Sequence, residues 1–324
     1  MAEPRVQRYT LGALFAVLLV LPLLLPRFYV DMLYQTLWYG ALALAWSLIG
    51  GYGKMLSLGH AAFVGVGAYS STLLFIHFDL SPWLGMLAGG VVAALLSFIV
   101  GLTCFRLSGH YFTIGTLILT ELLRSVFMEF PDFTGGATGL NVPFKREQPE
   151  LYMEFRSMAG YYYLVLALVL IIILVIYRLR KSDLGLQISA LGENELAARC
   201  LGVNTVLVKQ KVFLVSAFFC GMLGVVQTQY LMLIQVNTYF DALLSVKIAL
   251  IAFVGGSRTL VGPLLGAAIL IPLAQQLQAT LGGTYAGGQL ALYGLMVVLI
   301  CRYCPQGIWP VVAEWFEFWR SSPR

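Results

Sequence analysis

The chain has 324 residues, of which 60% are hydrophobic and 11% are charged, and its mean hydropathy is +0.85. Soluble domains carry about 25% charged residues, so this composition excludes a single water-soluble core. The formal net charge is +5, but in so apolar a chain we expect membrane lipid, rather than nucleic acid, to be the surrounding partner.

Apolar runs long enough to cross a hydrocarbon layer of about 30 Å recur along the whole chain. They predict an all-α fold, a polytopic transmembrane helical bundle of about ten spans that forms a single domain over residues 1–324. The expected spans are about 10–26, 31–50, 56–76, 82–104, 110–130, 160–177, 211–233, 241–256, 260–281 and 286–303.

The first run follows the basic residues Arg5 and Arg8 and so resembles a secretory signal peptide. Bulky Leu and Pro residues fill the place where a small-residue cleavage site should lie, and many further spans follow. A retained signal anchor is therefore the preferred interpretation.

Basic residues indicate the orientation. With the N-terminus in the cytoplasm, the ten spans place 14 of the 20 Lys and Arg residues on the cytoplasmic side and 4 outside, and leave Arg124 and Lys247 within spans. Cytoplasmic loops of membrane proteins carry such an excess. We therefore expect both termini in the cytoplasm, a periplasmic loop at about 131–159 and a cytoplasmic loop at about 178–210.

The segment 51–69 carries five glycines. A helix of this composition either approaches its neighbours closely or breaks to line a cavity. Its start also echoes a later segment, because Gly50-Gly51 precedes Lys54 as Gly255-Gly256 precedes Arg258. A vestigial internal repeat and a simple recurrence of basic, glycine-rich turns both explain the echo.

The expected span 110–130 contains the polar residues Thr113, Thr116, Thr120, Glu121 and Arg124. Residues 113, 116, 120 and 124 share one helix face, and Glu121 lies three residues from Arg124, close enough to pair. A charge at bilayer depth costs about 2.5–3.5 kcal/mol. These residues therefore either line a translocation path or form a neutralised pair that locks helices together.

Lys247 stands about six residues into the span 241–256. At about 1.5 Å per residue it lies about 9 Å from the outer end. Its ammonium either snorkels to that surface or belongs to the translocation path.

The cytoplasmic loop predicts a short helix over residues 193–201. It has acidic residues near its start, where the helix dipole favours them, two alanines that offer a small surface, and a glycine that ends it in a left-handed conformation. These positions are Glu193, Glu195, Ala197, Ala198 and Gly202. Such a helix is either an amphipathic connector or a contact for another protein.

Motifs for chemistry are missing from the sequence. The nearest approach to a phosphate-binding loop, Gly53-Lys54, is followed by Met55 and lacks the first glycine, so any ATP that powers this protein binds to another chain. Cys301 and Cys304 have CxxC spacing, but no second pair stands nearby to complete a metal site. We expect no cofactor and no metal.

Several segments together resemble the permeases of branched-chain amino acid importers of the ABC class. The cytoplasmic loop matches their loose pattern of Glu-Ala-Ala, three residues, then Gly, as Glu195, Ala197, Ala198 and Gly202. Further marks are residues 56–63 (Leu-Ser-Leu-Gly-His-Ala-Ala-Phe), 67–69, 111–112 before 116–117, 134–136 with 139–140, and the glycines of 255–256, 262 and 266. Their order and spacing cover about residues 50–310 and resemble the M-type subunit more than the H-type.

The resemblance implies a non-enzymatic permease in a bacterial inner membrane, for branched-chain amino acids or related small acids or amides. It implies a second permease subunit, a periplasmic substrate-binding protein, and two ATPase subunits docked on the cytoplasmic loops through the residues from Glu193 to Gly202. The main alternative, an ion-coupled secondary transporter, would need intramembrane ion sites, and only Glu121 qualifies among acidic residues near mid-span. An intramembrane enzyme would need a nucleophile and a base, which the sequence does not show.

Overall fold

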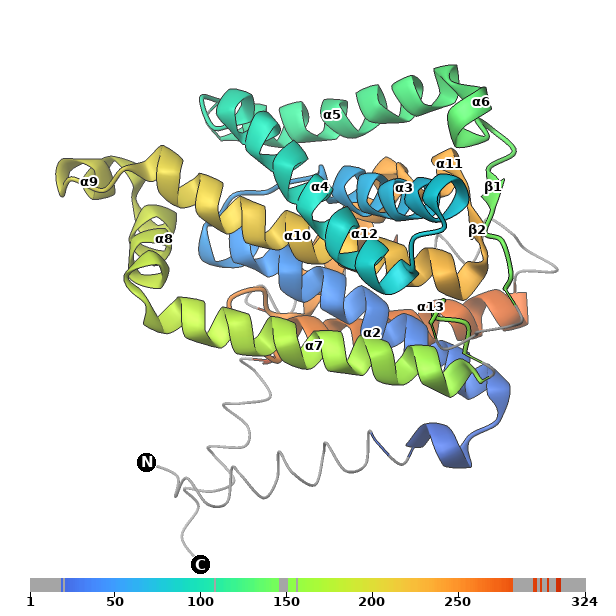
Figure 1. Cartoon of the computed structure of the whole chain (residues 1–324). Helices are drawn as coiled ribbons and strands as arrows, with labels where there is room; N and C mark the ends of the chain where they lie inside the picture. Colours follow the sequence, from blue (N-terminus) through green and yellow to red (C-terminus); the bar gives the residue numbers. More distant parts are fainter. Residues whose placement is uncertain are drawn as a thin grey trace, which may run out of the picture.

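Figure 1 shows the computed structural model of the chain. It describes residues 19, 21–107, 109–145, 151–155 and 157–281, together with positions 294, 295, 298, 302 and 307–309. The first and last expected spans, 10–26 and 286–303, lie largely outside the described residues, and so do Cys301 and Cys304.

The described chain is a helical bundle. In chain order its elements are α2 (Arg27–Ser47), the π-helix η1 (Leu48–Tyr52), α3 (His60–Phe78), α4 (Pro82–Cys104), α5 (His110–Glu129), α6 (Pro131–Thr134), β1 (Leu140–Asn141), α7 (Met158–Lys181), α8 (Asp183–Glu193), α9 (Glu195–Cys200), α10 (Thr205–Leu231), β2 (Leu233–Ile234), α11 (Val236–Tyr239), α12 (Ala242–Gly255) and α13 (Gly262–Leu281).

Most long helices run side by side (Figure 1). We call the end that carries α8 and α9 the α9 end, and the opposite end, with β1 and β2, the sheet end. Among the described helices, α3, α4, α5, α7, α10 and the α11–α12 segment are each long and apolar enough to cross a membrane. The expected helical membrane bundle is therefore confirmed in kind, whereas its count of ten spans stays a prediction.

Glycines bring three of the helices into backbone contact. A Cβ at Gly67 of α3 would lie 2.4 Å from the Cα atom of Gly221 on α10, and one at Gly89 of α4 would lie 2.5 Å from the carbonyl oxygen of Gly67. Helices in lipid associate through such small-residue contacts, because apolar tails remove the hydrophobic driving force. The close approach predicted for the glycine-rich segment is confirmed at Gly67.

The same segment also contains a break. Between η1 and α3, residues 53–59 form no helix, and their backbone groups are bonded by neighbouring elements instead. The Trp46 indole Nε1 donates to the Ser57 carbonyl over 2.7 Å. An unpaired backbone N–H or C=O group costs several kcal/mol in hydrocarbon. The break is tolerated because side chains bond to its backbone groups.

A small sheet corrects the expectation of a purely helical fold. β1 and β2 pair antiparallel, with Leu140 opposite Ile234 and Asn141 opposite Leu233. The pairing attaches the loop at about 131–159 to the turn between α10 and α11. The sequence pattern misses it because each strand has two residues, too few for an alternating pattern to be visible.

Candidate functional site

The predicted contact helix lies in a helix pair at the α9 end (Figure 1). The expected helix over residues 193–201 is divided at Asn194, which ends α8 and begins α9. The Asn194 side chain accepts a hydrogen bond from the Ala197 backbone N–H over 3.0 Å, which caps the new helix. The expected loop at 178–210 overlaps the ends of α7 and α10, and between them, over residues 182–204, it is two helices and their joints rather than one helix in a polar loop.

Gly202 ends this pair as predicted. Its φ is +83°, a left-handed value that a side chain disfavours, and its N–H donates to the Arg199 carbonyl over 2.9 Å. No atom lies within 4 Å of the position where a Cβ would stand. The glycine is therefore required by backbone conformation and not by lack of space.

Glu195 fixes α9 onto the rest of the protein. One of its oxygens accepts from Arg199 Nη2 over 2.7 Å and from Lys209 Nζ over 2.8 Å. Lys209 belongs to α10, and its side chain is only 5% exposed. Burial by itself would raise the pKa of Glu195, but Lys209 and then Arg199 leave that pKa below its ordinary value. The carboxylate is thus held ionised within the chain.

The two alanines do not form one exposed surface, so that expectation is wrong for Ala198. Ala197 is exposed, whereas Ala198 is 2% exposed and packs inside the chain. The tip of α9 instead exposes two leucines, Leu196 at 73% and Leu201 at 82%. The sequence analysis missed them, although bulky apolar residues in an otherwise polar loop are a signal that could have found them.

Glu193 also bonds within the chain. Its Oε2 accepts from Lys54 Nζ over 2.8 Å, and its Oε1 accepts from Arg258 Nη2 over 2.6 Å. The hydrogen bond from Lys54, and to a smaller extent that from Arg258, holds the pKa of Glu193 below its ordinary value. The two basic partners are the residues that follow the echoed glycine pairs in the sequence.

The threonines of α5 bond to the unwound segment. Thr113 donates to the Leu56 carbonyl over 2.7 Å, and Thr116 accepts from the Leu58 backbone N–H over 3.0 Å. Thr116 and Thr120 are fully buried. In this chain, these two residues therefore face protein rather than an open path, and Thr116 satisfies backbone that the break leaves unpaired.

Glu121 and Arg124 form the predicted pair in the turn that follows Thr120 on α5. Arg124 Nε donates to Glu121 Oε2 over 2.9 Å, and Arg124 Nη1 donates to Asn237 of α11 over 3.1 Å. The side chains of the pair are 43% and 41% exposed. Of the six helices that qualify as spans, α5 is the least buried. The two charges thus neutralise each other but remain about half exposed, on a helix that has little protein around it.

Lys247 lies over an aromatic ring. Its Nζ is 4.1 Å from the centroid of Tyr39 on α2, and no carboxylate of the described residues pairs with it. A cation over a Tyr ring is stabilised by the ring quadrupole, so the ammonium has a partial partner inside the bundle.

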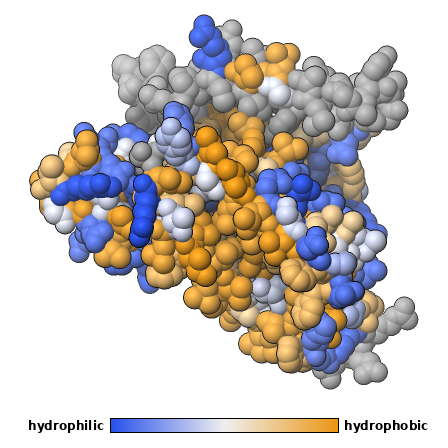
Figure 2. All heavy atoms as spheres, turned by 90° about the horizontal axis from the view of Figure 1, so that it is seen from above, coloured by the Kyte–Doolittle hydropathy of each residue, from blue (hydrophilic) through white to orange (hydrophobic). Residues whose placement is uncertain are grey.

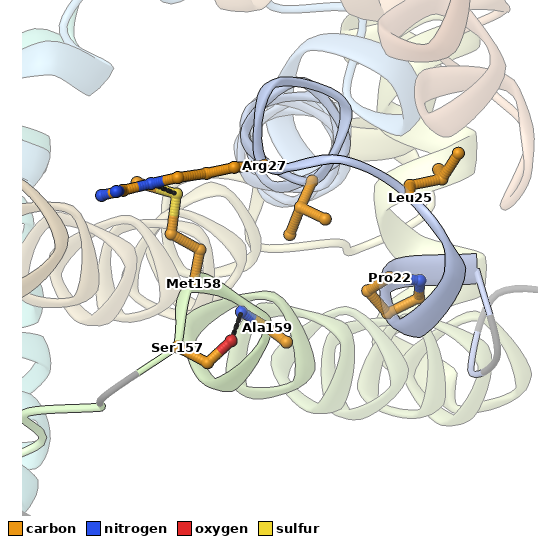
Figure 3. A pocket seen from close by; sticks show the side chains of 7 residues that line it. Pro22, Leu25, Arg27, Ser157, Met158 and Ala159 are labelled. Carbon is orange, nitrogen blue, oxygen red and sulfur yellow. Dashed lines mark hydrogen bonds between the residues drawn. The ribbon is translucent and has the colours of Figure 1, made fainter.

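Two of the cavities among the described residues, of about 360 Å³ each, lie at opposite ends. The one at the α9 end is lined by residues of the unwound segment, by Thr113 of α5 and by Glu195 and Lys209. The other lies between the starts of α2 and α7. Figure 3 shows the Arg27 side chain there beside Met158, whose Sδ lies 3.5 Å from Arg27 Nε. Only the first cavity contains residues that the sequence analysis had singled out.

Metal ligands are not gathered in the described part of the chain, where no group of three His, Cys, Asp or Glu side chains is placed to hold an ion. The α9 end presents ion pairs and exposed apolar side chains.

Apolar helices of membrane-spanning length, joined by glycine contacts and bearing a charged helix pair at one end, define a multi-pass membrane protein. Comparison with known proteins identifies which kind. The chain belongs to the family described as branched-chain amino acid transport system / permease component, whose model matches residues 28–301.

Individual relatives agree with the family. The high-affinity branched-chain amino acid transport system permease protein LivM of Salmonella typhimurium is 29% identical, over 94% of this chain and 75% of the relative. LivM of Escherichia coli gives the same identity and the same shares. A ribose import permease protein, RbsC of Haemophilus influenzae, is 29% identical over 48% of this chain and 49% of the relative. No solved structure matches the chain significantly.

Membership of this family makes the chain the permease subunit of an ABC transporter, a transport subunit rather than an enzyme. The suspected family resemblance is confirmed. An ion-coupled secondary transporter is not favoured.

Proposed function

We propose that this chain is one of two membrane-spanning subunits of an ATP-driven importer in a bacterial inner membrane. It would carry branched-chain amino acids or related small acids or amides, together with a second permease subunit, two ATPase subunits and a periplasmic substrate-binding protein. The family supports an ABC permease, and the names of the two LivM relatives support the substrate class.

The α9 end is the observation that carries the proposal. An importer must pass ATP-driven movement from a separate ATPase to the membrane without a covalent connection, so the contact must be rigid and apolar at its centre. Leu196 and Leu201 provide exposed apolar side chains. Glu195 provides the rigidity, because its bond to Lys209 holds α9 on α10 and its bond to Arg199 lies within α9.

The proposed role of each residue in this contact follows from its surroundings. Leu196, Ala197 and Leu201 meet the ATPase subunit directly, because they are exposed. Glu193, Glu195, Ala198 and Gly202 hold the helix in place, since they are bonded or packed within the chain or set the backbone turn.

The orientation belongs to the same proposal. Ten spans with both termini in the cytoplasm place the α9 end inside and the loop at about 131–159 outside, and the basic residues support this arrangement. A reporter fused after Arg180 should report the cytoplasm, and one fused near residue 149 the periplasm. Reversal of either result would defeat this topology.

The exposed side of α5 is proposed to face the second permease and the translocation path. Figure 2 looks onto the side of the molecule on which α5 lies and shows an apolar band with hydrophilic residues gathered on either side. The half-exposed pair of Glu121 and Arg124 is unsuited to lipid. We include Thr113 and Lys247 in this path as well, and assign Thr116 and Thr120 to the support of the unwound segment.

The docking surface can be tested with matched charged substitutions. Leu196→Asp and Leu201→Asp should each lower co-purification of the ATPase subunit about tenfold, because an anchor at the centre of an interface contributes more than about 1–2 kcal/mol. Uptake of radiolabelled leucine should fall with it. Leu151→Asp is the control, since Leu151 is 52% exposed but lies in the loop at about 131–159, away from α9. Intact ATPase association in both α9 variants would sink the proposal.

A further inference from the structure

Glu193 lies where three distant segments meet. It is the last residue of α8, directly before Asn194, whose side chain caps α9. Its two carboxylate oxygens bond separately to Lys54, which follows η1, and to Arg258, in the turn between α12 and α13. One side chain thus joins the helix pair to two turns that are about 200 residues apart.

The two turns also touch each other. A Cβ at Gly51 would lie 2.0 Å from the carbonyl oxygen of Ser257, so the two backbones are in direct contact. Each turn contains a residue in the left-handed region, Lys54 with φ of +51° and Gly256 with φ of +109°. A lysine with positive φ is uncommon, and strained residues of this kind cluster at switch regions and functional sites.

Each turn connects a pair of long helices. The first leads from α2 through the π-helix η1 and the unwound segment to α3, and the second leads from α12 to α13. π-helices and unwound segments are places where a membrane helix can bend. A displacement of α8 that pulls on both turns would therefore reach both helix pairs at the same time.

We propose that Glu193 is a positioning residue that transmits movement of α9 to both glycine turns at once. It does so through its internal bonds to Lys54 and Arg258, and not by touching the ATPase subunit. This inference rests on the proposed function, because it assigns the movement to a docked ATPase. The side chains of Lys54, Glu193 and Arg258 are 41%, 60% and 50% exposed. Exposed ion pairs contribute little free energy to folding, so a variant that lacks one should still fold and assemble.

The test uses the whole importer, purified from membranes with its own partner subunits and reconstituted into vesicles. Glu193→Gln keeps the shape of the side chain and removes its charge. Lys54→Gln and Arg258→Gln each remove one of its two ion pairs. The matched control is Asp79→Asn, which removes the carboxylate from the exposed pair of Asp79 with Lys145 in another part of the chain. Three quantities are measured on the assembled complex: bound ATPase subunit, rate of ATP hydrolysis, and leucine transported per ATP.

Glu193→Gln should retain bound ATPase and hydrolysis but lower the leucine transported per ATP by about fivefold, within the range that mutations along a coupling network produce. Each single-arm variant should give a smaller loss, and Asp79→Asn none. Combining Glu193→Arg with Arg258→Glu restores one ion pair with reversed charges and should recover part of the leucine transported per ATP.

Two results would overturn the inference. If Glu193→Gln transports as much leucine per ATP as the wild type, the bonds only hold α8 in place. This quantity can be measured even if only part of the variant protein assembles into the complex. Loss of bound ATPase in Glu193→Gln would show that the carboxylate is needed for docking itself rather than for transmission. Failure of the unmodified chain to bind an ATPase or to transport leucine would instead count against the proposed function.

Discussion

The acidic residues of α5 and those of the α9 end are neutralised by partners in different places. On α5, Glu121 bonds to Arg124 three residues further on, so the helix neutralises its own charge. At the α9 end, Glu195 also pairs with Arg199 of its own helix, but Glu193 and Glu195 in addition bond to Lys54 and Lys209 of other segments. The first pair makes a charge tolerable in a membrane, whereas the second set holds separate elements together.

The difference indicates how each region can work. Neutralisation within one helix suits α5, which is little buried and is proposed to face the second permease. A set of bonds between elements transmits displacement, which suits the end where an ATPase subunit is proposed to dock. Removal of one partner should therefore have different consequences in the two regions.

The largest effect should come from Glu195→Ala. Lys209 is almost completely buried, and loss of its carboxylate leaves an unpaired buried charge, at a cost of about 3–5 kcal/mol. We expect a clear fall in the melting temperature of the purified subunit and loss of ATPase co-purification. Lys209→Met in the same chain should restore most of the melting temperature. Unchanged melting of the single variant would contradict the tight α9–α10 connection.

Glu121→Ala should have a smaller effect. Arg124 loses its carboxylate but keeps Asn237 and is partly exposed, so the loss is that of a hydrogen bond to a charged group, about 1.5–3 kcal/mol. Protein abundance in the membrane and leucine uptake should fall, and Arg124→Leu in the same chain should recover part of both. Glu129→Ala, at the exposed end of the same helix, is the control. Normal abundance and uptake in Glu121→Ala would remove both a pathway and a structural role.

Gly202→Val tests chiefly backbone conformation, since no atom lies within 4 Å of the position where its Cβ would stand. The left-handed φ of +83° should cost a branched residue about 1–2 kcal/mol. We expect weaker ATPase co-purification from a subunit that still inserts in the membrane. Gly202→Asn should remain close to wild type, because Asn tolerates this conformation. Equal association of the Val and Asn variants would refute the requirement for a left-handed turn.

The smallest effect is expected outside both regions. Lys145 pairs with Asp79, and both side chains are well exposed. Exposed pairs of this kind contribute about 0–1 kcal/mol, so Lys145→Met should change neither the melting temperature nor ATPase association measurably. A loss comparable to that of Glu195→Ala would show that exposure does not distinguish these ion pairs.

Local patterns in the sequence determined much of this protein. Apolar run length predicted the long helices, because a membrane span needs little beyond an unbroken series of apolar residues. The pair of Glu121 with Arg124 and the left-handed Gly202 were also predicted correctly, since both depend on residues within one helical turn. The family could be suspected from the spacing of short motifs over about residues 50–310.

Only the tertiary structure decided what touches what. Glu193 meets Lys54 and Arg258 from 139 and 65 residues away, and no local rule specifies a partner at such a distance. Ala198 is buried while its neighbour Ala197 is exposed, because burial depends on how α9 packs onto the rest of the chain. Likewise Thr116 bonds to Leu58 because the chain unwinds before α3. Side-chain spacing fixes a helix face, but packing decides what that face meets.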